Sequence, residues 1–159
     1  MAMRAPQTLM TRAVAYLARR EHSRLELGKK LARYLAEDQT FDDVESVLDR
    51  LEAKGLLSDE RYARSRARVR SSRYGDTRVA MELKTQGVDS DLVRETIETL
   101  EEPEIVRATR LWERRFGEAH ADYKERARQI RFLASRGFRM DTVMRVINRA
   151  GDYEETDYE

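Results

Sequence analysis

The segment 86–97, QGVDSDLVRETI, has a counterpart fifty residues later in the segment 136–147, RGFRMDTVMRVI. In each copy a glycine is followed by an apolar residue, and an aspartate then begins a run whose apolar side chains recur every three or four positions. Glycine is common just after the end of a helix, and the apolar spacing is typical of an amphipathic helix. The sequence therefore predicts the same turn and helix twice.

The first part of the chain carries a weaker copy of this pattern. Leu27 and Leu31 correspond to Val79 and Leu83 at a shift of 52 residues. A period near 50 residues is typical of tandem three-helix modules, although amphipathic helices also agree in part by chance. Because one such unit buries too little apolar surface to be stable alone, neighbouring units must share their edges.

The repeat predicts an all-α protein in which three tandem three-helix repeats form an elongated array. From apolar spacing, capping residues and the positions of glycine and proline, we expect helices over residues 8–21, 24–36, 42–53, 59–72, 76–86, 90–101, 103–116, 122–136 and 140–149. The expected organisation is a flexible N-terminus at 1–9, repeats at 10–56, 57–102 and 103–150, and an acidic, disordered tail at 151–159.

The composition excludes several classes of function. The chain has no cysteine, which rules out disulfides, thiolate catalysis and cysteine-bound zinc and fits a reducing compartment. Its two histidines, His22 and His120, lie far apart, and we expect each to be solvated or to cap a helix. No metalloprotease, phosphate-loop or dinucleotide motif is present. We therefore expect a cytoplasmic protein with no enzyme activity, no cofactor, no metal site and no membrane contact.

Charge is unevenly distributed, and the most basic segment is Arg61–Arg73. It holds six arginines and no carboxylate, and Arg61, Arg64 and Arg68 share one flank of the predicted helix. With no acid expected at i±4, close arginines repel by roughly 0.2–0.5 kcal/mol per pair, which favours an anionic counterpart. Three interpretations stay open: contact with DNA phosphates, contact with a carboxylate-rich protein groove, or an ordinary solvated face.

The candidate partner-binding residues are all basic. They are Arg61, Arg64, Arg68 and Arg73 as the main group, Lys29, Lys30 and Arg33 in the first unit, and Arg126, Arg128 and Arg131 as a weaker third patch. Tyr62 has a different predicted role, because with Ala63 and Ala67 it forms an inward-facing stripe of the same helix.

Several stretches of the chain resemble the RecX family of recombination regulators. They are Tyr16–Leu27, YLARREHSRLEL, the run Val47–Ala63, VLDRLEAKGLLSDERYA, and, after the arginine-rich helix, Tyr74-Gly75 and Arg78–Leu83. The resemblance rests on their order and spacing, since no single motif is diagnostic. One departure from the family pattern is Arg66, where an aromatic or apolar residue is expected; another is the third unit, which lacks a clear counterpart of the turn at Tyr74.

The resemblance implies a crescent, that is, a curved array of three three-helix repeats, which binds the RecA recombinase in the groove of its filament on single-stranded DNA. It also implies that the protein inhibits the ATPase, strand-exchange and coprotease activities of RecA, and so modulates DNA repair, recombination and the SOS response. On this basis the arginine-rich segment faces either the acidic walls of the groove or the enclosed DNA, and the chain acts as a monomer.

Two other classes of function stay open. Three-helix units resemble helix-turn-helix modules, so a DNA-binding transcriptional regulator is the alternative; it requires one recognition helix with base-reading side chains. A passive helical scaffold is the third class, and its function would not change if the charges of Arg64 and Arg68 were reversed.

Overall fold

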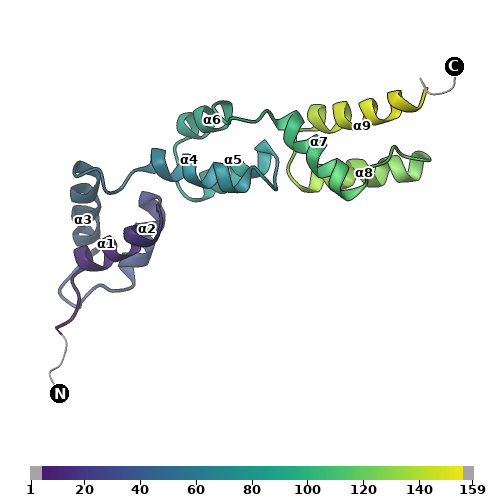
Figure 1. The fold of residues 1–159 in the computed structure, drawn as a ribbon. Helices are drawn as coiled ribbons and strands as arrows, with labels where there is room; N and C mark the ends of the chain where they lie inside the picture. Colours follow the sequence, from purple (N-terminus) through teal and green to yellow (C-terminus); the bar gives the residue numbers. More distant parts are fainter. Residues whose placement is uncertain (1–4, 156–159) are drawn as a thin grey trace.

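The structure is a computed structural model that describes residues 5–155, with side-chain surroundings for residues 5–151. The predicted flexibility of residues 1–4 and disorder of residues 156–159 therefore lie outside the described residues. Residues 5–155 contain nine α-helices and no strand: α1 (Leu9–Arg19), α2 (Arg24–Ala32), α3 (Phe41–Ala53), α4 (Asp59–Arg70), α5 (Asp76–Thr85), α6 (Ser90–Glu98), α7 (Glu104–Arg115), α8 (Tyr123–Ser135) and α9 (Met140–Glu155). They lie in three successive groups that form an elongated, bent array, which confirms the predicted fold class (Figure 1).

The helix boundaries differ from the predicted ones mainly at three C-terminal ends. Helix α2 ends at Ala32 rather than at residue 36, because the Tyr34 N–H bonds to the Leu31 carbonyl at 2.9 Å in a tighter turn. Helix α6 ends at Glu98 rather than at residue 101. Helix α9 continues to Glu155, so its predicted end at residue 149 was wrong.

Each group of three helices encloses its own small apolar core. Leu27 and Leu31 are fully buried in the first, as the repeat predicts. Leu83 in the second and Leu133 in the third are buried to the same extent, and Val93 and Val143 repeat this one helix later. The aligned positions therefore have the same role in successive groups, while the exact limits of the three repeats stay a prediction.

The second and third groups are joined by backbone hydrogen bonds. The Gly75 N–H donates to the Arg136 carbonyl at 2.8 Å, and the Thr77 N–H donates to the Gly137 carbonyl at 3.1 Å. Only glycine fits at position 75, because a Cβ there would lie 2.3 Å from backbone atoms of Phe138. The turn before α5 therefore lies directly against the turn before α9.

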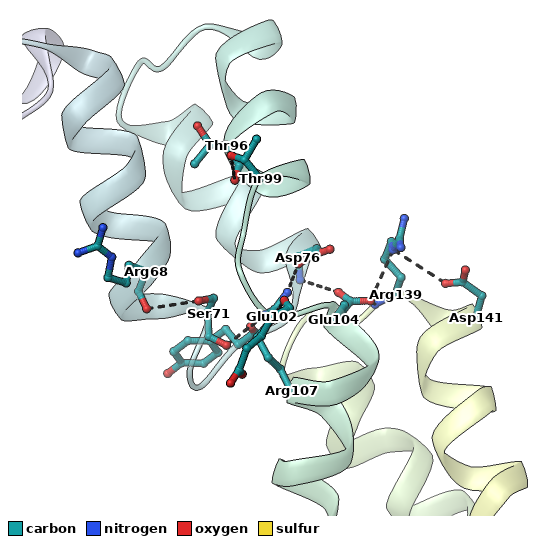
Figure 2. A network of polar contacts seen from close by, with 11 residues as sticks. Arg68, Ser71, Asp76, Thr96, Thr99, Glu102, Glu104, Arg107, Arg139 and Asp141 are labelled. Carbon is teal, nitrogen blue, oxygen red and sulfur yellow. Dashed lines mark hydrogen bonds and ion pairs between the residues drawn. The ribbon is translucent and has the colours of Figure 1, made fainter.

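A buried carboxylate completes this junction at the first residue of α7. Glu104 Oε2 accepts a hydrogen bond from the Asp76 N–H at 2.7 Å, and Oε1 accepts one from the Arg139 N–H at 3.3 Å (Figure 2). These N–H groups lie at the starts of α5 and α9, where a helix has no internal acceptor for its first donors and where negative charge is favourable. Glu104 thus caps two helices from different groups.

The first and second groups are joined by the same kind of contact. Asp59, the first residue of α4, accepts a hydrogen bond from the N–H of Arg24, the first residue of α2, at 2.8 Å. In both junctions the first helix of one group supplies a carboxylate that caps the second helix of the group before it. The edges that neighbouring units share are therefore polar at these points.

Gly75→Ala should weaken the second junction, because the added methyl group would overlap the Phe138 backbone, which cannot move aside as a flexible side chain can. We expect the free energy of unfolding to fall by roughly 1–3 kcal/mol, measured by urea denaturation followed by circular dichroism. The matched control is Gly151→Ala, whose Cβ would lie 3.4 Å from the His120 ring and which adds a better helix former. Equal effects of the two substitutions would contradict close packing at Gly75.

Candidate partner-binding surface

Helix α4 carries the arginine-rich segment, and a narrow apolar stripe sets its orientation. Ser58 caps the helix by accepting a hydrogen bond from the Arg61 N–H at 3.2 Å. Tyr62, Ala63 and Ala67 pack in the second core and are buried, which confirms the inward-facing stripe. Because these residues occupy the buried side of α4, every arginine of this helix except Arg70 is exposed to solvent.

Two of the four main candidates are paired with carboxylates of the same chain. Arg61 Nε lies 3.0 Å from Glu21 Oε1, and the Arg64 guanidinium lies 2.7 Å from Glu60 at i,i+4 spacing. The expectation of no acid at i±4 was therefore wrong at Arg64, since Glu60 lies just before the segment. Exposed pairs of this kind contribute little to stability, so an anionic partner can replace them at small cost.

The other arginines of the segment are of two kinds. Arg70 is partly buried and donates to both oxygens of Glu82, at 2.7 and 2.9 Å, which lowers the pKa of Glu82. Arg66, Arg68 and Arg73 are exposed, and within residues 5–151 no carboxylate lies at ion-pair distance from them. We call the exposed set the α4 cationic face: Arg61, Arg64, Arg66, Arg68 and Arg73. The sequence-based candidates did not include Arg66.

The candidates of the first unit are only partly available to a partner. Lys29 and Arg33 are exposed, but the Lys30 ammonium lies 2.9 Å from Nε2 of His22, which is 1% exposed. The His22 Nδ1–H donates to the Arg20 carbonyl at 3.0 Å, so Nε2 accepts from Lys30. Burial, with the nearby cationic charges, lowers the pKa of His22. His22 is therefore buried rather than solvated, and of its two predicted roles the hydrogen bond to the carbonyl of Arg20, the C-cap residue of α1, fits helix capping. Lys30 is held by this buried ring.

The candidates of the third unit lie on α8. Arg128 lies 3.3 Å from Glu125, and Arg126 donates to the Asn148 side-chain carbonyl at 3.4 Å. Arg131 is exposed and makes no ion pair within the described part of the chain. Because α2, α4 and α8 belong to successive groups of the array, the predicted residues form separate patches rather than one cluster (Figure 1).

A cavity of about 470 Å³ lies beside the α4 cationic face. Arg64 and Arg68 of α4 line one side of it, and Thr96 and Thr99 at the end of α6 line another. Arg68, Thr96 and Thr99 are drawn in Figure 2. The sequence did not predict this cavity, because helical spacing within α4 and α6 does not show which parts of the two helices meet.

Arg107 of α7 lies at the inner side of the cavity and is 3% exposed. Its guanidinium donates to the carbonyls of Ser71 and Tyr74, at 3.1 and 3.0 Å, and pairs with the Asp76 carboxylate (Figure 2). Burial and the adjacent Glu104 carboxylate raise the pKa of Asp76. The charge of Arg107 therefore compensates an acid that is costly to bury, and it fixes the second group against the third.

Within residues 5–151 no group of three or more histidine, cysteine, aspartate or glutamate side chains is placed to hold a metal ion. His120 is partly buried, and its Nδ1 has no hydrogen-bond partner within these residues. No helix in the described part of the chain has the length and apolar character needed to cross a membrane.

Comparisons with known proteins give consistent results. Two family models match, for the second three-helix domain of RecX at residues 58–97 and for the third at residues 102–147. The Regulatory protein RecX of Ralstonia nicotianae is 46% identical over 147 residues, which are 92% of this chain and 91% of that protein. That of Leptothrix cholodnii is 44% identical over 155 residues, or 97% and 96% of the two chains. The crystal structure of RecX from Lactobacillus salivarius has a similar fold, with a TM-score of 0.75 over 90% of this chain and 94% of that chain at 20% identity.

Arg107→Gln should strongly destabilise the fold, because it leaves the Asp76 carboxylate at the junction without its cation. We expect a loss of about 3–5 kcal/mol in the free energy of unfolding, measured by urea denaturation with Trp112 fluorescence as the signal. The matched control is Arg110→Gln, which removes a more exposed pair with Glu102 and should change stability little. If both variants unfold at the same urea concentration, the junction does not depend on Arg107.

Proposed function

The chain belongs to the RecX family of regulatory proteins, and from that premise we propose that it binds the RecA recombinase filament and inhibits its ATPase, strand-exchange and coprotease activities. On this proposal it acts as a cytoplasmic monomer in the helical groove of the filament, near the enclosed single-stranded DNA. The observation that carries the proposal is the α4 cationic face in the middle group of an elongated array, where Arg66, Arg68 and Arg73 make no ion pair within residues 5–151.

The shape of the array supports a long partner rather than a small one. Three groups in a row offer a surface that a polymer can contact through several of its subunits at once (Figure 1). The capped junctions at Asp59 and Glu104 hold neighbouring groups together, so less conformational entropy is lost on binding. The groove of a filament is also elongated, so it matches the shape of the array.

The charges of the array support an anionic partner. Arg66, Arg68 and Arg73 have no carboxylate at ion-pair distance within residues 5–151, so their field is not cancelled locally. Cationic patches of this kind attract an acidic surface and speed its encounter, and the attraction weakens with salt. Lys29, Arg33 and Arg131 extend the exposed positive charge into the outer groups.

The alternative of a transcriptional regulator has less support. A helix-turn-helix regulator places its base-reading side chains on one recognition helix. Here the exposed cations are shared among α2, α4 and α8, which belong to three successive groups. No observation on the described residues favours that alternative over a recombinase partner.

The double substitution Arg64→Glu/Arg68→Glu should abolish most of the inhibition, because it replaces attraction by repulsion at the centre of the proposed interface. We expect the concentration needed to inhibit ATP hydrolysis by RecA on single-stranded DNA to rise at least about tenfold, with a parallel loss of co-sedimentation with the filaments.

The matched control is Arg145→Glu/Arg149→Glu, which makes the same change of charge at the same i,i+4 spacing on exposed positions of α9. It should inhibit nearly as well as the unaltered chain. Unchanged ATP hydrolysis at every ratio of unaltered protein to RecA would refute the proposed function. Equal inhibition by both double variants would refute the assignment of the interface to α4.

A further inference from the structure

The cavity beside the α4 cationic face has walls of opposite character. Arg64 and Arg68 present guanidinium groups on the α4 side. The side formed by the end of α6 and the connection to α7 presents threonine hydroxyls together with Glu101 and Glu102. A ligand that fits this cavity must therefore carry a negative group at one end and hydrogen-bond donors at the other.

The hydroxyl groups of the cavity act as acceptors. The Thr96 hydroxyl donates a hydrogen bond to the Leu92 carbonyl at 2.6 Å, and the Thr99 hydroxyl donates one to the Glu95 carbonyl at 2.8 Å. Ser72, which also lines the cavity, donates to a backbone carbonyl of α4 at 2.9 Å. A hydroxyl group has one proton and two lone pairs, so these oxygens have only acceptor capacity left for a ligand.

The cations of the cavity differ in how far they are already used. Arg107 is committed to three backbone carbonyls and to Asp76, and Arg110 is paired with Glu102 at 2.7 Å. Arg64 has only its exposed pair with Glu60. Arg68 makes no ion pair within residues 5–151, so it is the lining cation that is free to bind an anion.

This combination disfavours a nucleic-acid strand in the cavity. The phosphates of a strand would approach the carboxylates of Glu101 and Glu102, and like charges repel. Base stacking on aromatic side chains supplies much of the affinity for single strands, and no aromatic residue is among the described residues that line the cavity. Because the hydroxyl groups of Thr96, Thr99 and Ser72 already donate to backbone carbonyls, they cannot donate a hydrogen bond to a phosphate.

A peptide with an acidic side chain matches the same walls. The planar guanidinium of Arg68 fits a carboxylate in a two-pronged arrangement, with Arg64 one turn away. Backbone N–H groups of the peptide can donate to the free lone pairs of Thr96 and Thr99. We infer that the cavity between α4 and the end of α6 binds an acidic side chain, with its flanking backbone, from a protein partner. This inference deepens the proposed function and rests on it only for the identity of that partner.

The test follows the backbone amide signals of Thr99 and Leu100 by nuclear magnetic resonance in the full chain. The probes are a blocked pentapeptide with adjacent aspartate and glutamate, its asparagine–glutamine counterpart, and a thymidine oligonucleotide. We expect saturable shifts with the acidic peptide alone. Arg68→Gln should weaken that binding at least about tenfold, as loss of a charged hydrogen bond does, and the exposed control Arg149→Gln should not.

A second variant, Thr99→Val, keeps every charge and removes one acceptor, so it should also weaken peptide binding. The inference is overturned if the oligonucleotide shifts these signals and the acidic peptide does not, if no probe shifts them, or if binding survives in Arg68→Gln. A chain that binds the peptide but leaves RecA unaffected refutes only the proposed function. A chain that inhibits RecA but does not bind the peptide refutes only the cavity inference.

Discussion

Carboxylates at the starts of α4 and α7 hold the array together. Asp59 and Glu104 each occupy the first position of a helix in one group and accept hydrogen bonds from the start of a helix in the group before. Such acceptors have strict directional requirements, and the N–H groups that they satisfy would otherwise be costly to bury. The cap therefore fixes how one group sits on the next, which a contact between flat apolar surfaces would specify less well.

The three separate cores make this role important. Each core is small, and the buried apolar residues of one group do not merge with those of the next. At the second junction Glu104 is joined by Arg107 and Asp76, so the contact becomes a buried polar network. Networks of this kind are costly when incomplete and specific when complete, which suits a boundary that must be rigid without being large. The cavity beside the α4 cationic face borders this network, because Arg107 and Ser71, whose carbonyl accepts a hydrogen bond from Arg107, both line it.

Ion pairs within the chain also decide which of its charged side chains stay unpaired at the surface. Many acids of the first unit are used internally, since the Arg24 guanidinium pairs with Glu45, Asp49 and Glu52 of α3. On α4, by contrast, only Arg70 has a partly buried pair, with Glu82, while the pairs of Arg61 and Arg64 are more exposed. A chain with a formal net charge of only +1 can therefore present a locally positive surface.

Within residues 5–155, the sequence by itself determined the nine helices, their grouping by three, and which side of α4 is buried, because apolar spacing and turn residues are local properties. It held one overlooked signal for the junction: Glu104 and Arg107 share a helical face with buried Ala108. Only the tertiary structure decided that Glu21 reaches Arg61, that His22 is buried against Lys30, and that α4 and α6 enclose a cavity. Helical periodicity orders neighbours along one helix, whereas an ion pair or a cavity depends on the distance between side chains of different helices, which the packing of the whole array sets.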